Sequence, residues 1–594
     1  MCGIIACRTQ TPAIDYLLRA LHRLEYRGYD SAGVAVQTTG GDVARLRTVG
    51  RVQVLDDAVQ RWDGPQLDGV GIGHTRWATH GLVSEQNAHP HQDCTGRISL
   101  VHNGILDDAV NLRTALTLAG HEFASEVDSE VLCHLIEDQL EQSGDLTRAV
   151  RSALASLSGS WAVAVLERGT GRVVVAAQGS PLLVANTGTA VFAASDIAAI
   201  AEWVDEFRVL EDGEVVELVD SDGVVGAAGN SVSPRMTRCV WRKQDAELNG
   251  YADYMAKEVD EQPAAAARVL DELAGGIASG ALARSLALPP FDRVQIMGCG
   301  SSLNAGRAIG NMVRRVSGLP VTLTIASEAS DEVVEPGTLC LAISQSGETA
   351  DVLSALAGRS PDVPVVAITN NMHSTLARRS QAVVNCAAGP EIGVAATKTF
   401  VCQVLAGSAL MLSALVAKDL LNTSDAAALA DDLRAAPENL AAAGTVAKCL
   451  VPPLAEDLFD AAGYLFIARG AGLPYAAEGA LKLKELSYRW AEYYPAGELK
   501  HGPLALIDSG TPVVVVDSFD PKLAANVAEA AARGGRILRI GGADSTIPVI
   551  RDTVAPWGPL EAVIPMQVLA RTIGLALGCD VDKPRNLAKS VTVE

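Results

Sequence analysis

The chain has 594 residues, which is too long for one hydrophobic core and corresponds to roughly three to four domains. Its formal net charge of −22 argues against a nucleic-acid-binding surface, because such a surface needs clustered lysine and arginine. The 11 cysteines contain no C-x-x-C pair, and no secretory signal is recognisable, so we expect reduced thiols in the cytoplasm. The most apolar stretch, 401–417, is too short for a membrane helix of about 20 residues. We expect a buried core helix there and no contact with a membrane.

The first part of the chain predicts antiparallel sheets with helices packed outside them. Short apolar segments at 33–37, 160–167, 172–185 and 189–196 are separated by turns, and 128–142 is a predicted helix. The pattern is lost between about 220 and 253, where glycine, serine and polar residues dominate. We therefore predict a domain over 2–218 and a linker over 219–270.

From residue 292 onward, apolar strands, glycine turns and helices alternate, which predicts βαβ units around parallel sheets. The pattern occurs twice: VQIMGCGSSLNAG at 294–306 matches LFIARGAGLPYAAEG at 465–479, and ASE at 326–328 matches AGE at 496–498. This internal duplication predicts two α/β domains, at 271–420 and 453–585. An alanine-rich helical connector is expected over 421–452, and a tail over 586–594.

Cys2 is a candidate nucleophile, because removal of Met1 would place a free α-amine beside its thiol. An α-amine with a pKa of about 7.7 to 8.0 can act as the base near neutral pH. Asn103 and the backbone N–H of Gly104 are candidate oxyanion donors. Arg76 is suited to a carboxylate and Asp128 to an ammonium group, so the pair could hold a free amino acid by both ends.

Several segments of this region together resemble the class II glutamine amidotransferase domain, which has the N-terminal-nucleophile fold of two sheets between helices. They are MCGI, LEYRGYDSAG at 24–33, HTRWATHG at 74–81 and VHNG at 101–104. The resemblance implies that Thr79 and His80 lie around glutamine and that Trp77 is a gate between two active sites. A zinc site is the alternative for His74, His80, His89, His91 and His102. No cysteine or carboxylate completes a convincing ligand set for them, and no metal is expected.

The stretch SQSGET at 344–349 follows an apolar strand and begins a helix, which favours an anion site made of N–H groups, hydroxyls and the helix dipole. It is not a nucleotide P-loop, so a compact sugar phosphate fits better. A purely structural turn is the alternative reading. The second element, GCGSS at 298–302, favours the functional one, and both units are similar to the SIS, or sugar isomerase, domain.

Lys482 and Glu485 are three residues apart on a predicted helix, and His501 lies in the turn KHGP. The Lys–Glu pair alone is more often a solvated salt bridge, but a nearby histidine can move protons near neutral pH. Glu485 and His501 would form the acid/base set that opening and isomerising a sugar requires. Lys589 lies six positions from the end of the sequence, in DVDKPRNLAKSVTVE.

From residue 2 to 594 the sequence resembles the glucosamine-6-phosphate synthase family. This resemblance implies L-glutamine and fructose 6-phosphate as substrates, no cofactor and a homodimer. Lys589 would form an imine with the sugar, His501 would open its ring, Glu485 would move a proton from C1 to C2, and Lys482 would support the anion. Ammonia would travel inside the protein from one site to the other. The implied sugar-phosphate contacts are Ser301, Ser302, Ser344, Gln345, Ser346, Thr349, Val394 and Ala588.

Two alternatives remain open. The family usually has serine at Ala396, threonine at Ser301 and histidine at Asp253, and the loss of one hydroxyl near a polar ligand can change selectivity by about 1 to 3 kcal/mol. A related amidotransferase that uses another keto-sugar phosphate is therefore one alternative. A regulatory sugar-phosphate sensor with an inactive glutaminase is the other, although a sensor has no need for Glu485, His501 and Lys589 together.

Overall fold

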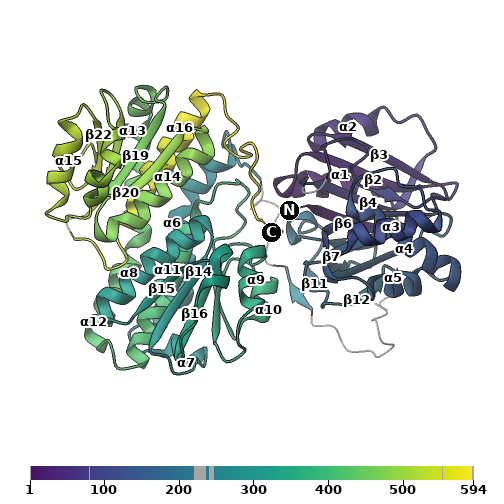
Figure 1. Ribbon diagram of the computed structural model, residues 1–594, viewed down its shortest axis with the longest axis horizontal. Coiled ribbons are helices and arrows are strands. Elements are labelled where there is room, and N and C mark those ends of the chain that lie inside the picture. Colours follow the sequence, from purple (N-terminus) through teal and green to yellow (C-terminus); the bar gives the residue numbers. More distant parts are fainter. Residues whose placement is uncertain (1, 79–80, 220–235, 240–246, 552, 592–594) are drawn as a thin grey trace. The chain divides into compact units, whose positions relative to one another are not determined.

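The computed structural model describes residues 2–78, 81–219, 236–239, 247–551 and 553–591. Two compact units are present: Met1–Glu247 with Ser590–Glu594, and Leu248–Lys589. Figure 1 labels the helices and strands of both units.

The first unit contains two antiparallel sheets. The larger sheet has the strand order β13-β11-β9-β10-β1-β4-β2-β3, and the smaller has the order β12-β8-β7-β6-β5. The strands of the larger sheet are β1 (Gly3–Thr9), β2 (Ser31–Thr38), β3 (Val43–Val49), β4 (Leu67–Arg76), β9 (Leu183–Asn186), β10 (Ala190–Ala194), β11 (Glu206–Val209) and β13 (Thr237–Arg238). Those of the smaller sheet are β5 (His91–Gln92), β6 (Ile98–Leu106), β7 (Gly159–Glu167), β8 (Val173–Gln178) and β12 (Glu214–Glu217).

Alternation along β1 explains how the layers of this unit stack. Ile4 and Ala6 enter the core between the two sheets, whereas Ile5 and Cys7 pack on the helix side, as the period of two in a strand requires. The helices on that side are α1 (Ala13–Leu24) and α2 (Val52–Gln60). The smaller sheet is covered by α4 (Asp128–Ser143) and α5 (Leu146–Leu154), while α3 (Ala109–Ala119) contacts α4. The predicted order of helix, sheet, sheet and helix is confirmed.

The second unit contains two five-stranded parallel sheets of the same topology, β15-β14-β16-β17-β18 and β20-β19-β21-β22-β23 (Figure 1). The first is built from β14 (Arg293–Gly298), β15 (Val321–Ile325), β16 (Thr338–Ser344), β17 (Val365–Thr369) and β18 (Ala382–Asn385). The second is built from β19 (Gly463–Ala468), β20 (Trp490–Pro495), β21 (Pro512–Val516), β22 (Arg536–Gly541) and β23 (Ile547–Pro548). The identical strand order confirms the duplication that the sequence predicts.

The glycine turn after the first strand is also duplicated. Gly300 begins α8 (Gly300–Ser317) with a φ of 51°, and Gly470, just before α14 (Leu473–Ser487), has a φ of 53°. Both values lie in the left-handed region that L side chains rarely adopt, which explains why glycine occupies the same place in each copy. α8 and α14 pack against each other and join the two sheets into one core.

The remaining helices of the second unit complete this core or cover it. α11 is long and apolar enough to cross a membrane, but 94% of its apolar window is buried within the protein, so it is the core helix predicted for 401–417. Asp253 is the N-cap residue of α6, and its Oδ1 accepts the N–H of Ala256. The same carboxylate forms an ion pair with Arg571 of α16. The helices are α6 (Tyr254–Leu273), α7 (Ala281–Ser285), α9 (Ala350–Ala357), α10 (Thr375–Arg379), α11 (Lys398–Ala417), α12 (Thr423–Arg434), α13 (Ala436–Glu456), α15 (Leu523–Ala531) and α16 (Val563–Ala576).

Candidate functional site

Cys2 lies immediately before β1, beside the backbone that follows β4. The N–H of Trp77 donates to its Sγ at 3.3 Å, and the thiol is 3.6 Å from the carbonyl oxygen of Trp77. A Cβ on Gly3 would lie 2.6 Å from Thr75 Oγ1 and 2.7 Å from Leu24 Cβ. Because residue 3 has no side chain, the start of β1 packs closely against β4 and α1, and this packing positions the thiol of Cys2.

The loop YRGYD packs against the same backbone. A Cβ on Gly28 would lie 2.6 Å from the carbonyl carbon of Arg76, so only glycine allows this approach. Asp30 donates its N–H to the carbonyl of Arg76, and its Oδ2 accepts the N–H of Ala78 at 2.9 Å. The ring of Tyr29 packs edge-on against Trp77, with centroids 5.4 Å apart. These residues, absent from our predicted site, hold the segment that carries Arg76 and Trp77.

Asn103 points its amide group toward Cys2. Its Nδ2 donates to the carbonyl oxygen of Cys2 at 3.0 Å, while its Oδ1 accepts from Nε2 of His74 at 3.1 Å. Burial lowers the pKa of His74 to about 3, so the ring is neutral and its Nε2 carries the proton. His74 thereby fixes which end of the amide faces Cys2. Gly104 follows with a φ of 134°, and a Cβ there would collide with Ser160.

Arg76 and Asp128 bring opposite charges to this region. Arg76 ends β4 and is 3% exposed; burial lowers its pKa, against the attraction of Cys2, Asp30 and Asp128. Asp128 begins α4, and its Oδ2 accepts the N–H of Leu106. Arg76 therefore interacts electrostatically with both Asp128 and the Cys2 thiol. Thr79 and His80, the other predicted glutamine contacts, lie outside the described residues.

Four histidines of the alternative zinc set, His74, His89, His91 and His102, are buried and neutral. The rings of His74 and His89 are 4.0 Å apart, and those of His89 and His91 are 4.6 Å apart. Burial lowers the pKa of each of them, and of His102. Among the described residues, their nitrogens do not belong to any group of three or more converging metal donors. His80 lies outside the described residues.

In the second unit, the predicted phosphate loop connects β16 to α9. The Ser344 and Thr349 hydroxyls are 2.8 Å apart, and the N–H of Gly347 donates to Ser344 Oγ at 3.0 Å. Ser346 Oγ accepts the N–H of Glu348. Gly347 has a φ of 67°, which folds the loop tightly over Ser374. The hydroxyls of 344–349 are thus gathered at one helix N-terminus. Ser302, on α8, accepts from Gln403 Nε2.

Lys482 lies between two carboxylates on α14. Its Nζ is 2.6 Å from Glu485 Oε2 and 3.5 Å from Glu478 Oε1, and its side chain is 1% exposed. Burial alone would lower the pKa of Lys482, but the two glutamates outweigh burial and raise it. The lysine therefore remains an ammonium.

Glu478, which our predicted site lacks, connects α14 to α8. Ser301 Oγ donates to its Oε1 at 2.8 Å, and Asn304 Nδ2 donates to its Oε2 at 2.9 Å. The serine at 301 therefore supplies the hydroxyl that a threonine would also supply at this position.

Lys589 is held in a buried ion pair. Its Nζ donates to Glu391 Oε2 at 2.5 Å and to the carbonyl of Gly393 at 2.8 Å, and its side chain is 3% exposed. Burial would raise the pKa of Glu391, but Lys589 and the N–H groups of Thr397 and Thr399 lower it to about 2. Val394 lies beside this pair, with its N–H on the carbonyl of Asp582. Lys589 is thus hydrogen-bonded to the residue directly before Val394, and Ala588 directly precedes the lysine.

Glu258 of α6 makes the folding stability of the protein depend on pH. Its Oε1 accepts the N–H groups of Ile392 and Gly393, while burial, and then Glu391, raise its pKa to about 8. The pKa of Glu258 is thus higher in the folded protein than its unfolded value of about 4.3. Its contribution to the free energy of unfolding is therefore complete below pH 4.3 and is lost as pH rises to 8. Glu258→Gln keeps both accepted bonds without the charge. We expect the melting temperature of wild type, relative to Glu258→Gln, to fall as pH rises from about 5 to 9. A difference that does not vary with pH would contradict the assignment.

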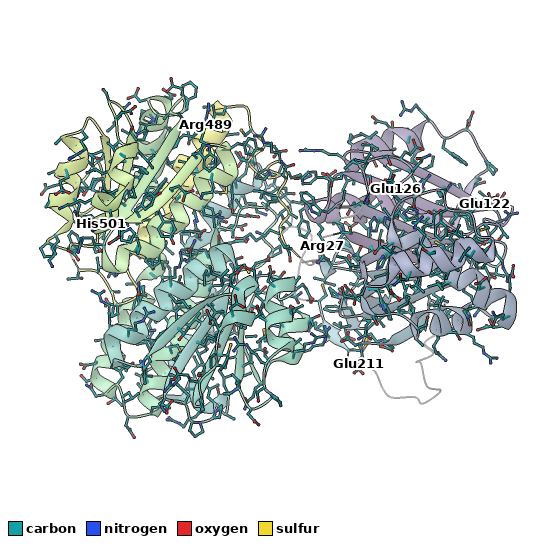
Figure 2. The ribbon with its side chains drawn as sticks, viewed as in Figure 1. Arg27, Glu122, Glu126, Glu211, Arg489 and His501 are labelled. Atoms are coloured by element: carbon teal, nitrogen blue, oxygen red, sulfur yellow. The ribbon has the colours of Figure 1, made fainter. Side chains whose placement is uncertain are left out.

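His501 is exposed, at the end of a 3₁₀ turn (Ala496–His501), and Figure 2 shows it at the margin of its unit. Within the described part of the chain, no hydrogen bond or ion pair joins it to Lys482 or Glu485. The acid/base role of His501 together with Glu485 therefore stays a prediction.

Comparisons with known proteins agree with this division. Residues 74–202 match the family described as the glutamine amidotransferase domain, and residues 290–413 and 457–548 match the SIS domain. The solved C-terminal domain of glucosamine-fructose-6-phosphate aminotransferase from Francisella tularensis is 34% identical, with a TM-score of 0.50; it covers 57% of this chain, and 99% of that domain is covered. Fold and site together define an enzyme class, a glutamine amidotransferase linked to SIS domains.

Full-length relatives narrow this class. Proteins named glutamine–fructose-6-phosphate aminotransferase (isomerizing) from Thermus thermophilus and Bradyrhizobium diazoefficiens are 40% and 39% identical, over 100% of this chain and 100% of their own length. The chain belongs to the family of glutamine–fructose-6-phosphate aminotransferases.

Proposed function

We propose that this enzyme converts D-fructose 6-phosphate and L-glutamine to D-glucosamine 6-phosphate and L-glutamate. One observation carries the proposal: the same chain holds Cys2 beside the amide group of Asn103 and a buried lysine, Lys589, in the unit that contains the SIS domains. The full-length relatives carry this activity in their names.

In the glutaminase half, the Cys2 thiolate attacks the glutamine carboxamide after Met1 is removed, with the free α-amine as base. Asn103 Nδ2 and the N–H of Gly104 would stabilise the oxyanion, since the amide already faces Cys2. Arg76 binds the substrate carboxylate, and Asp128 its ammonium. Thr79 and His80 would contact glutamine, and Trp77 would act as the gate between the two active sites. Collapse of the tetrahedral intermediate breaks the C–N bond and leaves an acyl–sulfur bond on Cys2, while ammonia departs with a proton from the α-amine. Water then hydrolyses the acyl–sulfur bond to glutamate and restores the thiol, while the ammonia is the nitrogen that the second site uses.

In the synthase half, Ser344, Gln345, Ser346 and Thr349 would bind the phosphate, because their hydroxyls and N–H groups gather at the start of α9. Lys589 forms the imine at C2 with loss of water, and ammonia displaces the lysine. Glu485 then carries the proton between C1 and C2, with the Lys482 ammonium beside the anionic intermediate. Ser301, Ser302, Val394 and Ala588 line the sugar.

The amide nitrogen provides the direct test. Enzyme supplied with glutamine labelled with ¹⁵N in the amide group and with fructose 6-phosphate should give glucosamine 6-phosphate that carries the label, as measured by mass spectrometry. The label should persist in the presence of excess unlabelled ammonium if ammonia passes inside the protein. Absence of hexosamine phosphate with either glutamine or ammonia would refute the proposal. Because the family usually has serine at Ala396, another ketose phosphate is the alternative substrate. Turnover measured with fructose 6-phosphate and with several other ketose phosphates decides between these substrates.

The amide of Asn103 should contribute strongly to glutamine hydrolysis. We expect Asn103→Ala to lower kcat of hydrolysis by about 10²- to 10³-fold, the usual cost of one lost oxyanion donor, with a small effect on KM. Asn111→Ala, on the exposed face of α3, is the matched control and should behave as wild type. A rise in KM with kcat unchanged would mean that Asn103 only binds the substrate.

The exposure of His501 supports a homodimer as part of this proposal, because a second copy could bring this histidine to the Lys482–Glu485 pair. Light scattering on the purified enzyme measures the oligomeric state. Cytoplasmic location also belongs to the proposal, since the structure joins none of the described cysteines in a disulfide.

A further inference from the structure

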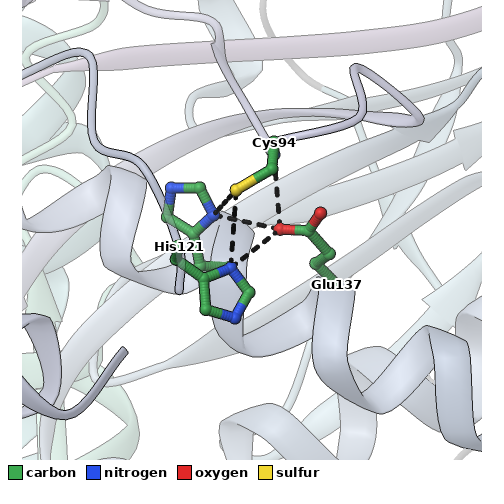
Figure 3. A group of neighbouring side chains, drawn as sticks. Cys94, His121 and Glu137 are labelled. Carbon is green, nitrogen blue, oxygen red and sulfur yellow. Dashed lines mark hydrogen bonds and ion pairs between the residues drawn. The ribbon is translucent and has the colours of Figure 1, made fainter. Parts of the chain in front are cut away.

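Four side chains that the proposed reaction does not use converge in the first unit (Figure 3). Cys94 lies in the loop between β5 and β6, and His121 follows the end of α3. His134 and Glu137 are one turn apart on α4. Cys94 Sγ, one nitrogen of each histidine and one Glu137 oxygen all lie within 4.8 Å of one another. Three separate segments thus direct a thiol, two imidazoles and a carboxylate at one point.

Hydrogen bonds leave the thiol of this cluster without a matched partner. Glu137 Oε2 can accept from the Cys94 N–H and from both Nδ1 groups, and then neither nitrogen has a lone pair for the thiol proton. Cys94 Sγ is 3.5 Å from Nδ1 of both His121 and His134, and the same two nitrogens are 3.1 and 3.0 Å from Glu137 Oε2. A proton on either Nδ1 can point at the sulfur or at the oxygen, and one thiol proton cannot serve two nitrogens. A cation at the centre satisfies all four lone pairs at once.

The distances match those of a tetrahedral zinc site. Bonds of about 2.3 Å to sulfur and about 2.0 to 2.1 Å to nitrogen and oxygen, at tetrahedral angles, place sulfur and nitrogen about 3.6 Å apart and nitrogen and oxygen about 3.4 Å apart. The observed sulfur–nitrogen distances of 3.5 Å agree, and the nitrogen–oxygen distances of 3.0 and 3.1 Å need only a small expansion.

The surroundings also suit a metal. Nε2 of His121 is 3.0 Å from Asp138 Oδ1, the kind of carboxylate contact that orients a ligating histidine. His134 is fully buried against the ring of Phe123. Glu137 lines a cavity of about 720 Å³, and the exposed Cys94 gives an ion access from solvent.

We propose that Cys94, His121, His134 and Glu137 form a structural site for zinc. Thiolate and imidazole ligands select zinc over magnesium or calcium. Four protein ligands leave no open position for a substrate or water, which distinguishes a structural site from a catalytic one. The ion would tie the β5–β6 loop and the end of α3 to α4, the helix that begins with Asp128. This inference is independent of the proposed reaction.

Zinc binding by the full-length protein tests the proposal. Protein stripped with a chelator and dialysed against Zn²⁺ alone should retain one zinc ion per chain by elemental analysis, and its melting temperature should rise. Cys94→Ser should lose this zinc, whereas Cys449→Ser, at an exposed cysteine of α13, should retain it. Asp138→Asn should weaken zinc binding by about 10- to 100-fold in competition with a chromogenic chelator. Wild type without stoichiometric zinc, or Cys94→Ser with as much zinc as wild type, would overturn the proposal.

Cobalt substitution of the wild-type protein needs no variant to fold. Co²⁺ in the site should give a thiolate-to-cobalt charge-transfer band and the intense visible bands of tetrahedral coordination. A spectrum with only weak, octahedral bands and no charge-transfer band would also overturn the assignment.

Discussion

Replacing Lys589 by alanine or by arginine will abolish glucosamine 6-phosphate synthesis and leave glutamine hydrolysis intact. An imine requires a primary amine, which alanine lacks and which the guanidinium of arginine does not provide. The two variants differ in their effect on Glu391: alanine leaves this buried carboxylate without its cation, at a cost of about 3 to 5 kcal/mol, while arginine can retain the charge. Loss of synthesis in both, with stability maintained in Lys589→Arg, therefore assigns the loss to chemistry.

Borohydride gives the covalent evidence for this lysine. Wild type reduced in the presence of fructose 6-phosphate should gain the mass of one sugar phosphate on the peptide containing Lys589. Lys522→Ala, at an exposed lysine just before α15, is the control and should be trapped as wild type is. Synthesis that persists without Lys589, or sugar trapped on a different lysine, would show that the imine is formed elsewhere.

Replacing Cys2 by alanine will remove glutamine-dependent synthesis and spare synthesis from ammonium salts. Loss of a covalent nucleophile lowers kcat on the order of 10⁶-fold, and glutamine hydrolysis should fall by a similar factor. The second site should work normally, since its residues all belong to the other unit. Steady-state rates with glutamine and with ammonium measure both effects.

Two checks accompany this variant. Cys449→Ala removes an exposed thiol of the second unit and should retain both activities. The mass of the N-terminal peptide should show that Met1 is absent from active enzyme. Glutamine-dependent turnover by Cys2→Ala, or full activity with Met1 retained, would exclude an N-terminal nucleophile.

Much of the fold could be predicted because its signals are local. The apolar segments 33–37, 160–167 and 189–196 fall on β2, β7 and β10, and the repeated glycine turns at Gly300 and Gly470 indicate two copies of one parallel-sheet unit. The segment 172–185, predicted as one apolar segment, forms β8 and β9, which belong to different sheets. The residues Gly179-Ser180-Pro181 between them are a turn signal that marks the break.

The partners of the predicted catalytic groups could not be predicted. Glu391 precedes Lys589 by 198 residues, and His74 precedes Asn103 by 29, so sequence spacing carries no sign of either contact. Glu478 was visible only as one helical charge among several. The Cys94 cluster was missed for the same reason, because its first histidine lies 27 residues after the cysteine. Only the motif residues themselves, such as Cys2 and SQSGET, could be identified from the local sequence.

The buried pair of Glu391 and Lys589 has a consequence for the resting enzyme. Cells contain aldehydes and dicarbonyl metabolites that condense with unprotonated amines. An ammonium that is bonded to a carboxylate and almost shielded from water has no lone pair to offer them. In the proposed mechanism Lys589 is therefore protected from such carbonyl compounds until a ligand enters the pocket and breaks the pair with Glu391.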